Sequence, residues 1–140
     1  MTRERLARLM PVARAKYEAE FASVRALLQA ESHCRAQLAR IEEMSKSVRD
    51  QSLEAGPMQL IGADVLFQKS IDKNRSELNR KLAQILAHKE TAMIKVRTAF
   101  GRKHAIELAE ARLAASAAHE NEKRQRDRAL APWLNGSKTR

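Results

Sequence analysis

Apolar residues recur along most of the chain at alternating spacings of three and four positions. One such run extends from Met10 to Val48 and a second from Ile71 to Ala117. Between them, Gly56-Pro57 reads as a helix stop, because glycine suits the left-handed residue after a helix and proline cannot continue one. Heptad runs of this length are typical of coiled-coil helices rather than of short globular helices.

One break between two heptad runs predicts a helical hairpin. We expect an all-α fold, with two long helices in an antiparallel coiled-coil hairpin over residues 1–131 and the turn at about residues 54–64. Pro132 should end the second helix near Ala131 and leave residues 132–140 as a flexible C-terminal tail. The second helix is then the longer one, at about 100–110 Å against about 80 Å, since each residue adds about 1.5 Å.

Three local features refine this picture. Pro11 predicts a kink or a late start of the first helix, because proline in a helix interior removes a hydrogen bond and clashes with the preceding turn. Residues from about 112 to 130 should extend beyond the end of the first helix. Gly101 is expected to allow close helix approach opposite Ala13 or Ala15.

The core is expected to be the seam between the two helices. The branched aliphatic side chains expected to be among the most buried are Leu27, Leu38, Ile41, Leu78, Leu82, Ile85 and Ile106. Several seam positions are polar or charged, and antiparallel pairing should bring Glu31 near Lys89. Such residues mainly fix register, because burying charge is costly.

The densest apolar patch follows the predicted turn. Its members are Leu60, Ile61, Val65, Leu66 and Phe67. Two interpretations remain open, namely a plug that caps the end of the hairpin and an exposed docking patch.

Charge is distributed unevenly along the chain, whose formal net charge is +10. Residues 1–16 carry five basic and one acidic side chain, whereas residues 42–64 carry two basic and five acidic ones. Folding at Gly56-Pro57 lays residues 3–16 beside residues 95–103, which are also basic. The sequence therefore predicts a basic end at the termini and an acidic end at the turn.

The residue pattern offers little catalytic chemistry. The four histidines are scattered, and no glycine-rich phosphate loop is visible. Cys34 lies on the apolar seam, as expected of a small buried hydrophobe. No stretch approaches the about 18 apolar residues of a membrane span. We expect a protein that is not an enzyme, holds no cofactor or metal, binds no small molecule, and works in the cytoplasm or is exported by a route that reads no secretory signal.

The layout resembles the flagellar FliJ and type III secretion YscO stalk proteins. The features that match are the size, the opening Met1-Thr2-Arg3-Glu4-Arg5-Leu6-Ala7-Arg8-Leu9 running straight into a helix, one break near Gly56-Pro57, and a longer second helix with a basic end. The resemblance covers nearly the whole chain and rests on layout rather than on a motif.

The resemblance implies a central-stalk or coupling component of an export ATPase. Such proteins insert the end bearing their termini into the hexameric ATPase ring, and the rest of the rod reaches towards the cytoplasmic domain of the export gate. The resemblance also implies a location in the cytoplasm, or peripherally at the inner-membrane export apparatus. A generic coiled-coil adaptor or scaffold remains the alternative. Nucleic-acid binding is less favoured, because basic and acidic side chains alternate on the polar faces of the helices.

Basic residues near the termini are the candidate partner-binding residues, because basic patches attract acidic partners. They are Arg5, Arg8, Arg14, Lys95, Arg97, Arg102, Lys103, Arg112, Lys123, Arg124, Arg126 and Arg128.

Overall fold

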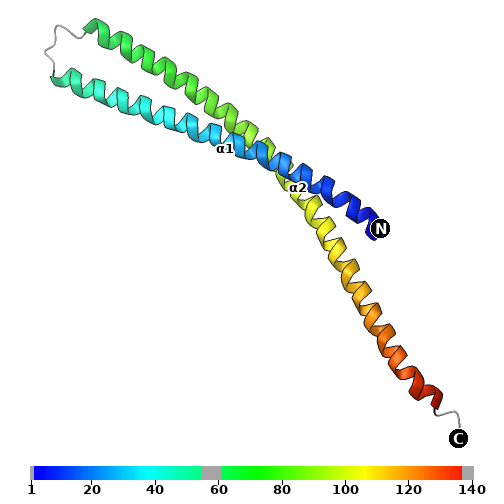
Figure 1. Cartoon of the computed structure of the whole chain (residues 1–140). Helices are drawn as coiled ribbons and strands as arrows, with labels where there is room; N and C mark the ends of the chain where they lie inside the picture. The colour runs from blue at the N-terminus through cyan, green and yellow to red at the C-terminus, as the bar shows by residue number, and fades with distance from the viewer. Residues whose placement is uncertain (1, 55–60, 137–140) are drawn as a thin grey trace. The chain divides into compact units, whose positions relative to one another are not determined.

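The computed structural model describes residues 2–54 and 61–136, which form two long α-helices. Helix α1 spans Arg3–Glu54 and helix α2 spans Ile61–Gly136. They run antiparallel as a hairpin (Figure 1), and the described residues contain no strand. The all-α hairpin with a longer second helix is thus confirmed. The expected turn around Gly56-Pro57 falls on residues 55–60, outside the described part of the chain.

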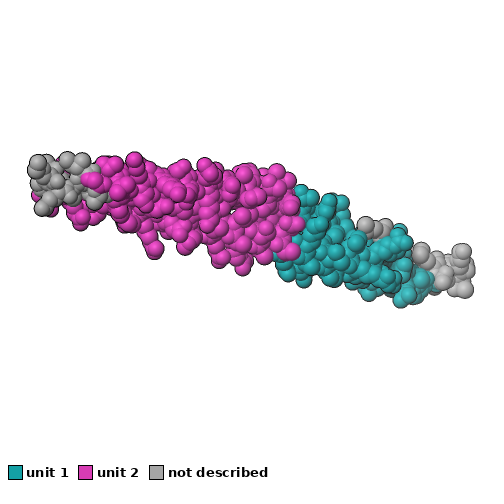
Figure 2. Space-filling view, turned by 90° about the horizontal axis from the view of Figure 1, so that it is seen from above, with its two compact units in different colours: residues 1–18, 98–140 teal, residues 19–97 magenta. Residues whose placement is uncertain are grey.

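The hairpin divides into two compact units (Figure 2). Unit 1 contains residues 1–18 and 98–140, and unit 2 contains residues 19–97. In both units, α1 packs against α2 along one seam.

The prolines do not end the helices. Helix α1 begins at Arg3, where the Thr2 carbonyl accepts hydrogen bonds from the Arg5 and Leu6 amides at 3.0 and 3.2 Å, and it continues through Pro11. The expected late start at Pro11 is therefore wrong. Helix α2 likewise passes Pro132 and ends at Gly136 rather than near Ala131. Both prolines lie in exposed stretches, so a carbonyl that loses its helical partner can turn to water.

The seam follows the predicted heptads, but small side chains dominate its most buried positions. The buried residues are Leu6, Val24, Cys34, Ser45, Ile71, Ile85, Ala92 and Ala99. Of the seven side chains expected to be most buried, only Ile85 belongs to this set. The expectation is wrong for the other six, which are only half-buried, namely Leu27, Leu38, Ile41, Leu78, Leu82 and Ile106. A seam between only two helices is open on both flanks, so most of its side chains stay half-buried, and long residues such as Leu6, Ile71 and Ile85 are covered at some positions only.

Two further expectations concern single positions. A Cβ atom added to Gly101 would meet nothing within 4 Å, so this glycine does not serve close helix approach. The patch after the turn is exposed where it can be assessed, since Val65, Leu66 and Phe67 are 49%, 70% and 38% accessible. These three side chains do not form a plug. Leu60 and the side chain of Ile61 lie outside the part of the chain that the structure describes.

Candidate functional site

A charged layer crosses the seam of unit 2. Lys89 Nζ donates a hydrogen bond to Glu31 Oε2 at 2.6 Å, and Arg35 donates to Glu31 Oε1 at 2.9 Å. These bonds, with that from Lys89 the stronger influence, hold the pKa of the Glu31 carboxyl below its ordinary value of 4.5. The predicted pairing of Glu31 with Lys89 is confirmed. An ion pair of Arg75 with Glu42 at 3.1 Å adds a second link between the helices.

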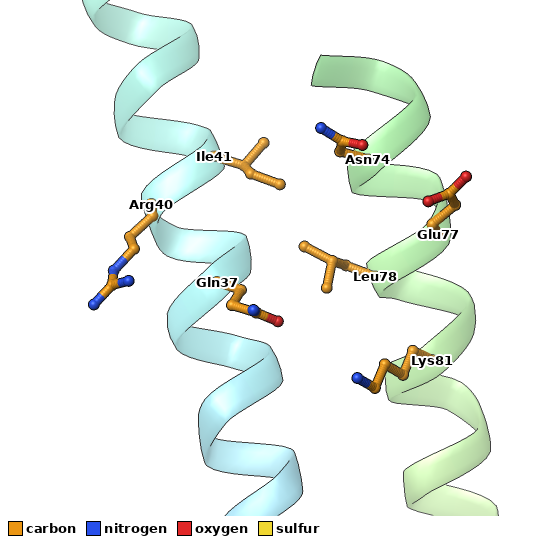
Figure 3. A pocket seen from close by; sticks show the side chains of 7 residues that line it. All are labelled: Gln37, Arg40, Ile41, Asn74, Glu77, Leu78 and Lys81. Atoms are coloured by element: carbon orange, nitrogen blue, oxygen red, sulfur yellow. The ribbon is translucent and has the colours of Figure 1, made fainter. Parts of the chain in front are cut away.

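A mixed groove opens on one side of unit 2. It has a volume of about 480 Å³ and is lined by Gln37, Arg40, Ile41, Asn74, Glu77, Leu78 and Lys81. Figure 3 shows Ile41 and Leu78 extending from α1 and α2 into the space between the helices, while Arg40 points away. Its lining combines acidic, basic, amide and apolar groups, so it favours no single ligand chemistry.

Aromatic and charged side chains meet in unit 1. The Tyr17 and Phe100 rings lie 5.9 Å apart, and the Phe100 ring stacks on His104 at 5.8 Å. Lys103 Nζ lies 5.2 Å from the centre of the Tyr17 ring and 3.4 Å from Glu107 Oε1. Lys103 is therefore a half-buried seam residue with defined contacts, in contrast to the exposed cations around it.

Unit 1 also has a groove that is almost entirely apolar, which we call the basic groove after its two charged residues. Its volume is about 370 Å³, and it is lined by Leu9, Val12, Ala13, Lys16, Ala99, Arg102, Ala105 and Ile106. Leu9 and Val12 are 42% and 66% exposed, so α2 leaves much of their apolar surface uncovered. Lys16 on α1 and Arg102 on α2 are the charged side chains in its lining.

A second groove in unit 1 has different chemistry, and we call it the acidic groove. It is lined by Arg3, Ala7, Glu107, Glu110, Ala111 and Ala114. Two carboxylates thus lie on this groove, whereas the basic groove has none. The contrast gives unit 1 two grooves that differ in charge and apolar character.

Apart from the half-buried Lys103, the basic residues proposed from sequence are exposed and fall into three groups. Arg5, Arg8, Arg14, Arg102 and Arg112 lie in unit 1 before the exposed end of α2, and Lys95 and Arg97 lie in unit 2. Every side chain from Ala114 to Trp133 whose accessibility is described is exposed. This exposed part of α2, which we call the extension, carries the remaining cations beyond Arg112, namely Lys123, Arg124, Arg126 and Arg128. Arg124 lies 3.7 Å from Glu120 one turn away.

Sequence reasoning missed the basic groove. Leu9, Val12 and Ala105 lie beside the seam rather than on it, and a search for one apolar stripe passes over them. Their signal was an apolar residue at positions flanking the heptad seam, where charged residues are usual.

Within the described residues, no three His, Cys, Asp or Glu side chains gather closely enough to hold a metal ion. Neither described helix has an apolar stretch that could cross a membrane. Cys34 is buried, with its thiol 3.4 Å from the Leu78 carbonyl.

Comparison with protein-family models, curated proteins and solved structures gave no match.

Proposed function

We propose that the protein is a non-enzymatic central-stalk or coupling component of a flagellar or type III protein-export ATPase. Its partners would be the hexameric ATPase and the cytoplasmic domain of the export gate, in the cytoplasm or at the inner-membrane export apparatus. The observation that carries the proposal is the construction of unit 1. There, a short paired part of the hairpin leads into an exposed extension of α2 that carries four cations and three carboxylates.

The charges of unit 1 suit a partner with acidic loops. Arg5, Arg8, Arg14 and Arg102 lie exposed on the paired part, and four more cations lie on the extension. Exposed cations raise the rate of association with acidic surfaces, and salt weakens the effect. A ring lined with acidic side chains could therefore accept this end of the protein.

The experiment measures ATP hydrolysis by a purified hexameric export ATPase with and without the protein. We expect stimulation by the wild type, and a loss of several-fold for Arg14→Glu with Arg102→Glu, larger at low than at high salt. Lys103 is left unchanged because it packs in the seam. The matched control is Arg40→Glu with Arg80→Glu, which reverses two exposed arginines of unit 2.

Two results together would contradict the proposal. They are wild-type stimulation by the unit 1 double variant at low ionic strength, and full stimulation by a protein truncated after Arg112. Absence of stimulation by the wild type would contradict it directly.

A coiled-coil adaptor or scaffold is the second candidate function. The exposed apolar side chains near the turn favour it, since Leu53 and Leu66 are 86% and 70% accessible. An adaptor would bind its partners without changing ATP hydrolysis, so the same assay separates the two functions.

A further inference from the structure

The basic groove presents a second set of helix-periodic positions beside the seam. On α1, Arg5, Leu9, Val12 and Lys16 follow one another at spacings of four, three and four. On α2, Arg102, Ala105, Ala109 and Arg112 continue the same side at spacings of three, four and three. Two neighbouring stripes at such spacings form the surface on which a third helix packs in a coiled coil.

The shape of the groove fits a helix with large apolar side chains. Ala13, Ala99 and Ala105 contribute only methyl groups to its lining, whereas Leu9, Val12 and Ile106 contribute larger apolar groups. The uncovered surface of Leu9 and Val12 would leave water if an apolar side chain entered, which is favourable in proportion to the area buried. From Arg5 to Lys16 the stripe is about 16 Å long, or three helical turns.

Charge selects among the helices that could pack there. The eight positions of the two stripes carry four cations, Arg5, Lys16, Arg102 and Arg112, and no carboxylate. The acidic groove has Glu107 and Glu110 in its lining against one cation, Arg3, so the carboxylates of the same helix would meet more like charge there. A second copy of this chain would bring the same cations face to face if it used the same groove.

We propose that the basic groove binds an amphipathic helix of an acidic partner protein, with apolar residues on its inner face and carboxylates along both edges. Its apolar side chains enter between α1 and α2, and its carboxylates pair with Lys16 and Arg102. This inference follows from unit 1 alone and does not depend on a role in an export ATPase.

The test uses the full-length protein and a fluorescein-labelled, lactam-stapled helical peptide of 18 residues. The probe has leucine at its a and d positions and glutamate at its e and g positions. A control peptide replaces each glutamate by lysine. Fluorescence anisotropy at low salt should show binding of the glutamate peptide, with the lysine peptide at least about tenfold weaker.

Two variants then locate the site by different physical effects. Val12→Asp places a negative charge at an exposed position of the groove, where it repels the glutamates of the peptide. Ala105→Trp fills the groove without changing its charge. Each should weaken binding of the glutamate peptide by about tenfold or more. Leu28→Asp, at a half-exposed apolar position of unit 2, and Glu107→Gln, in the acidic groove, should stay within about twofold of wild type. Circular dichroism verifies that every variant remains helical.

Equal binding of the two peptides, or wild-type binding by both Val12→Asp and Ala105→Trp, would overturn the proposal. Sedimentation velocity addresses a second copy as the occupant. If the wild type is a dimer that Val12→Asp converts to a monomer, the groove is a self-association surface and the assignment to a partner helix fails.

Discussion

At the scale of residues, Glu31 links the two helices of unit 2. Its carboxylate accepts hydrogen bonds from Lys89 on α2 and from Arg35 one turn along α1. Both bonds favour the ionised form, which is why the pKa of this carboxyl lies below 4.5. The folded protein therefore binds fewer protons at this site than the unfolded chain.

The sign of the pH effect follows from that difference. The contribution of Glu31 to stability is complete above pH 4.5 and is lost as the pH falls through the lowered pKa. We expect the melting temperature of the wild type to fall on acidification by more than that of Glu31→Gln. Glu43→Gln, at an exposed position on the same helix, is the control. If the melting temperatures of the wild type and Glu31→Gln fall equally with pH, the interactions of Glu31 with Lys89 and Arg35 do not contribute to stability.

Gly101 offers a gain in stability. It lies in the interior of α2 at an exposed position, and a Cβ atom added there would meet open space. Gly101→Ala should raise the free energy of unfolding by about 0.5–1 kcal/mol, because alanine loses less backbone freedom in a helix. Urea denaturation measures the change. Gly136→Ala, at the end of α2, should have a smaller effect, and a loss of stability in Gly101→Ala would indicate a contact at this position.

At the scale of elements, the seam side of α2 determines how tightly the helices pack. The described buried residues of α2, Ile71, Ile85, Ala92 and Ala99, all fall on one heptad position, which also holds the half-buried Leu78 and Ile106. Leu82, on the other seam position, is half-buried. The stabilising surface is thus concentrated along one line of α2.

The loss of stability on truncating a side chain should increase with the burial of that side chain. Ile85→Ala should reduce the free energy of unfolding by about 2–4 kcal/mol and Leu82→Ala by about 1–2 kcal/mol, because Leu82 already contacts water. Leu28→Ala, half-exposed on α1, should cost less than either. Thermal and urea denaturation of the three variants give the comparison. An equal or larger loss for Leu82→Ala would put the assignment of the buried line in error.

The extension should contribute little to the stability of the paired helices. Its side chains are exposed, and a helix without tertiary packing is only marginally stable in water. A protein ending at Ala118 should therefore unfold at nearly the same urea concentration as the full chain. Its helical circular dichroism signal should fall by no more than the share of residues removed. A large shift in the midpoint would mean that the extension packs against the rest of the protein.

At the scale of the whole molecule, a net charge of +10 is spread unevenly over the chain. Cations outnumber carboxylates in residues 2–18 and 98–136, and repulsion among them opposes folding. We expect the melting temperature to rise when sodium chloride is increased from about 10 mM to about 150 mM, since salt shortens the range of this repulsion. Arg5→Gln with Arg14→Gln should reduce the rise. A melting temperature that falls with salt would show that ion pairs such as Glu31 with Lys89 dominate instead.

The sequence determined that there are two helices and which face of each is buried, because a heptad pattern permits one buried face per helix. Their antiparallel pairing and register followed from the single break between the two heptad runs. The meeting of Glu31 with Lys89 followed from that register alone. The charges of unit 1 were also readable, since exposed basic residues need no precise packing to act at a distance.

Only the tertiary structure decided which seam residues are covered and where the flanks are hollow. Coverage differs between positions that the heptad pattern treats alike, since Ile71 and Ile85 are buried whereas Leu78, on the same heptad position, is half-buried. The basic groove exists because Ala13 and Ala99, close to the contact between the helices, leave space beside Leu9 and Val12. A one-dimensional pattern records which residues share a face. It does not record the volume that remains when two faces are brought together.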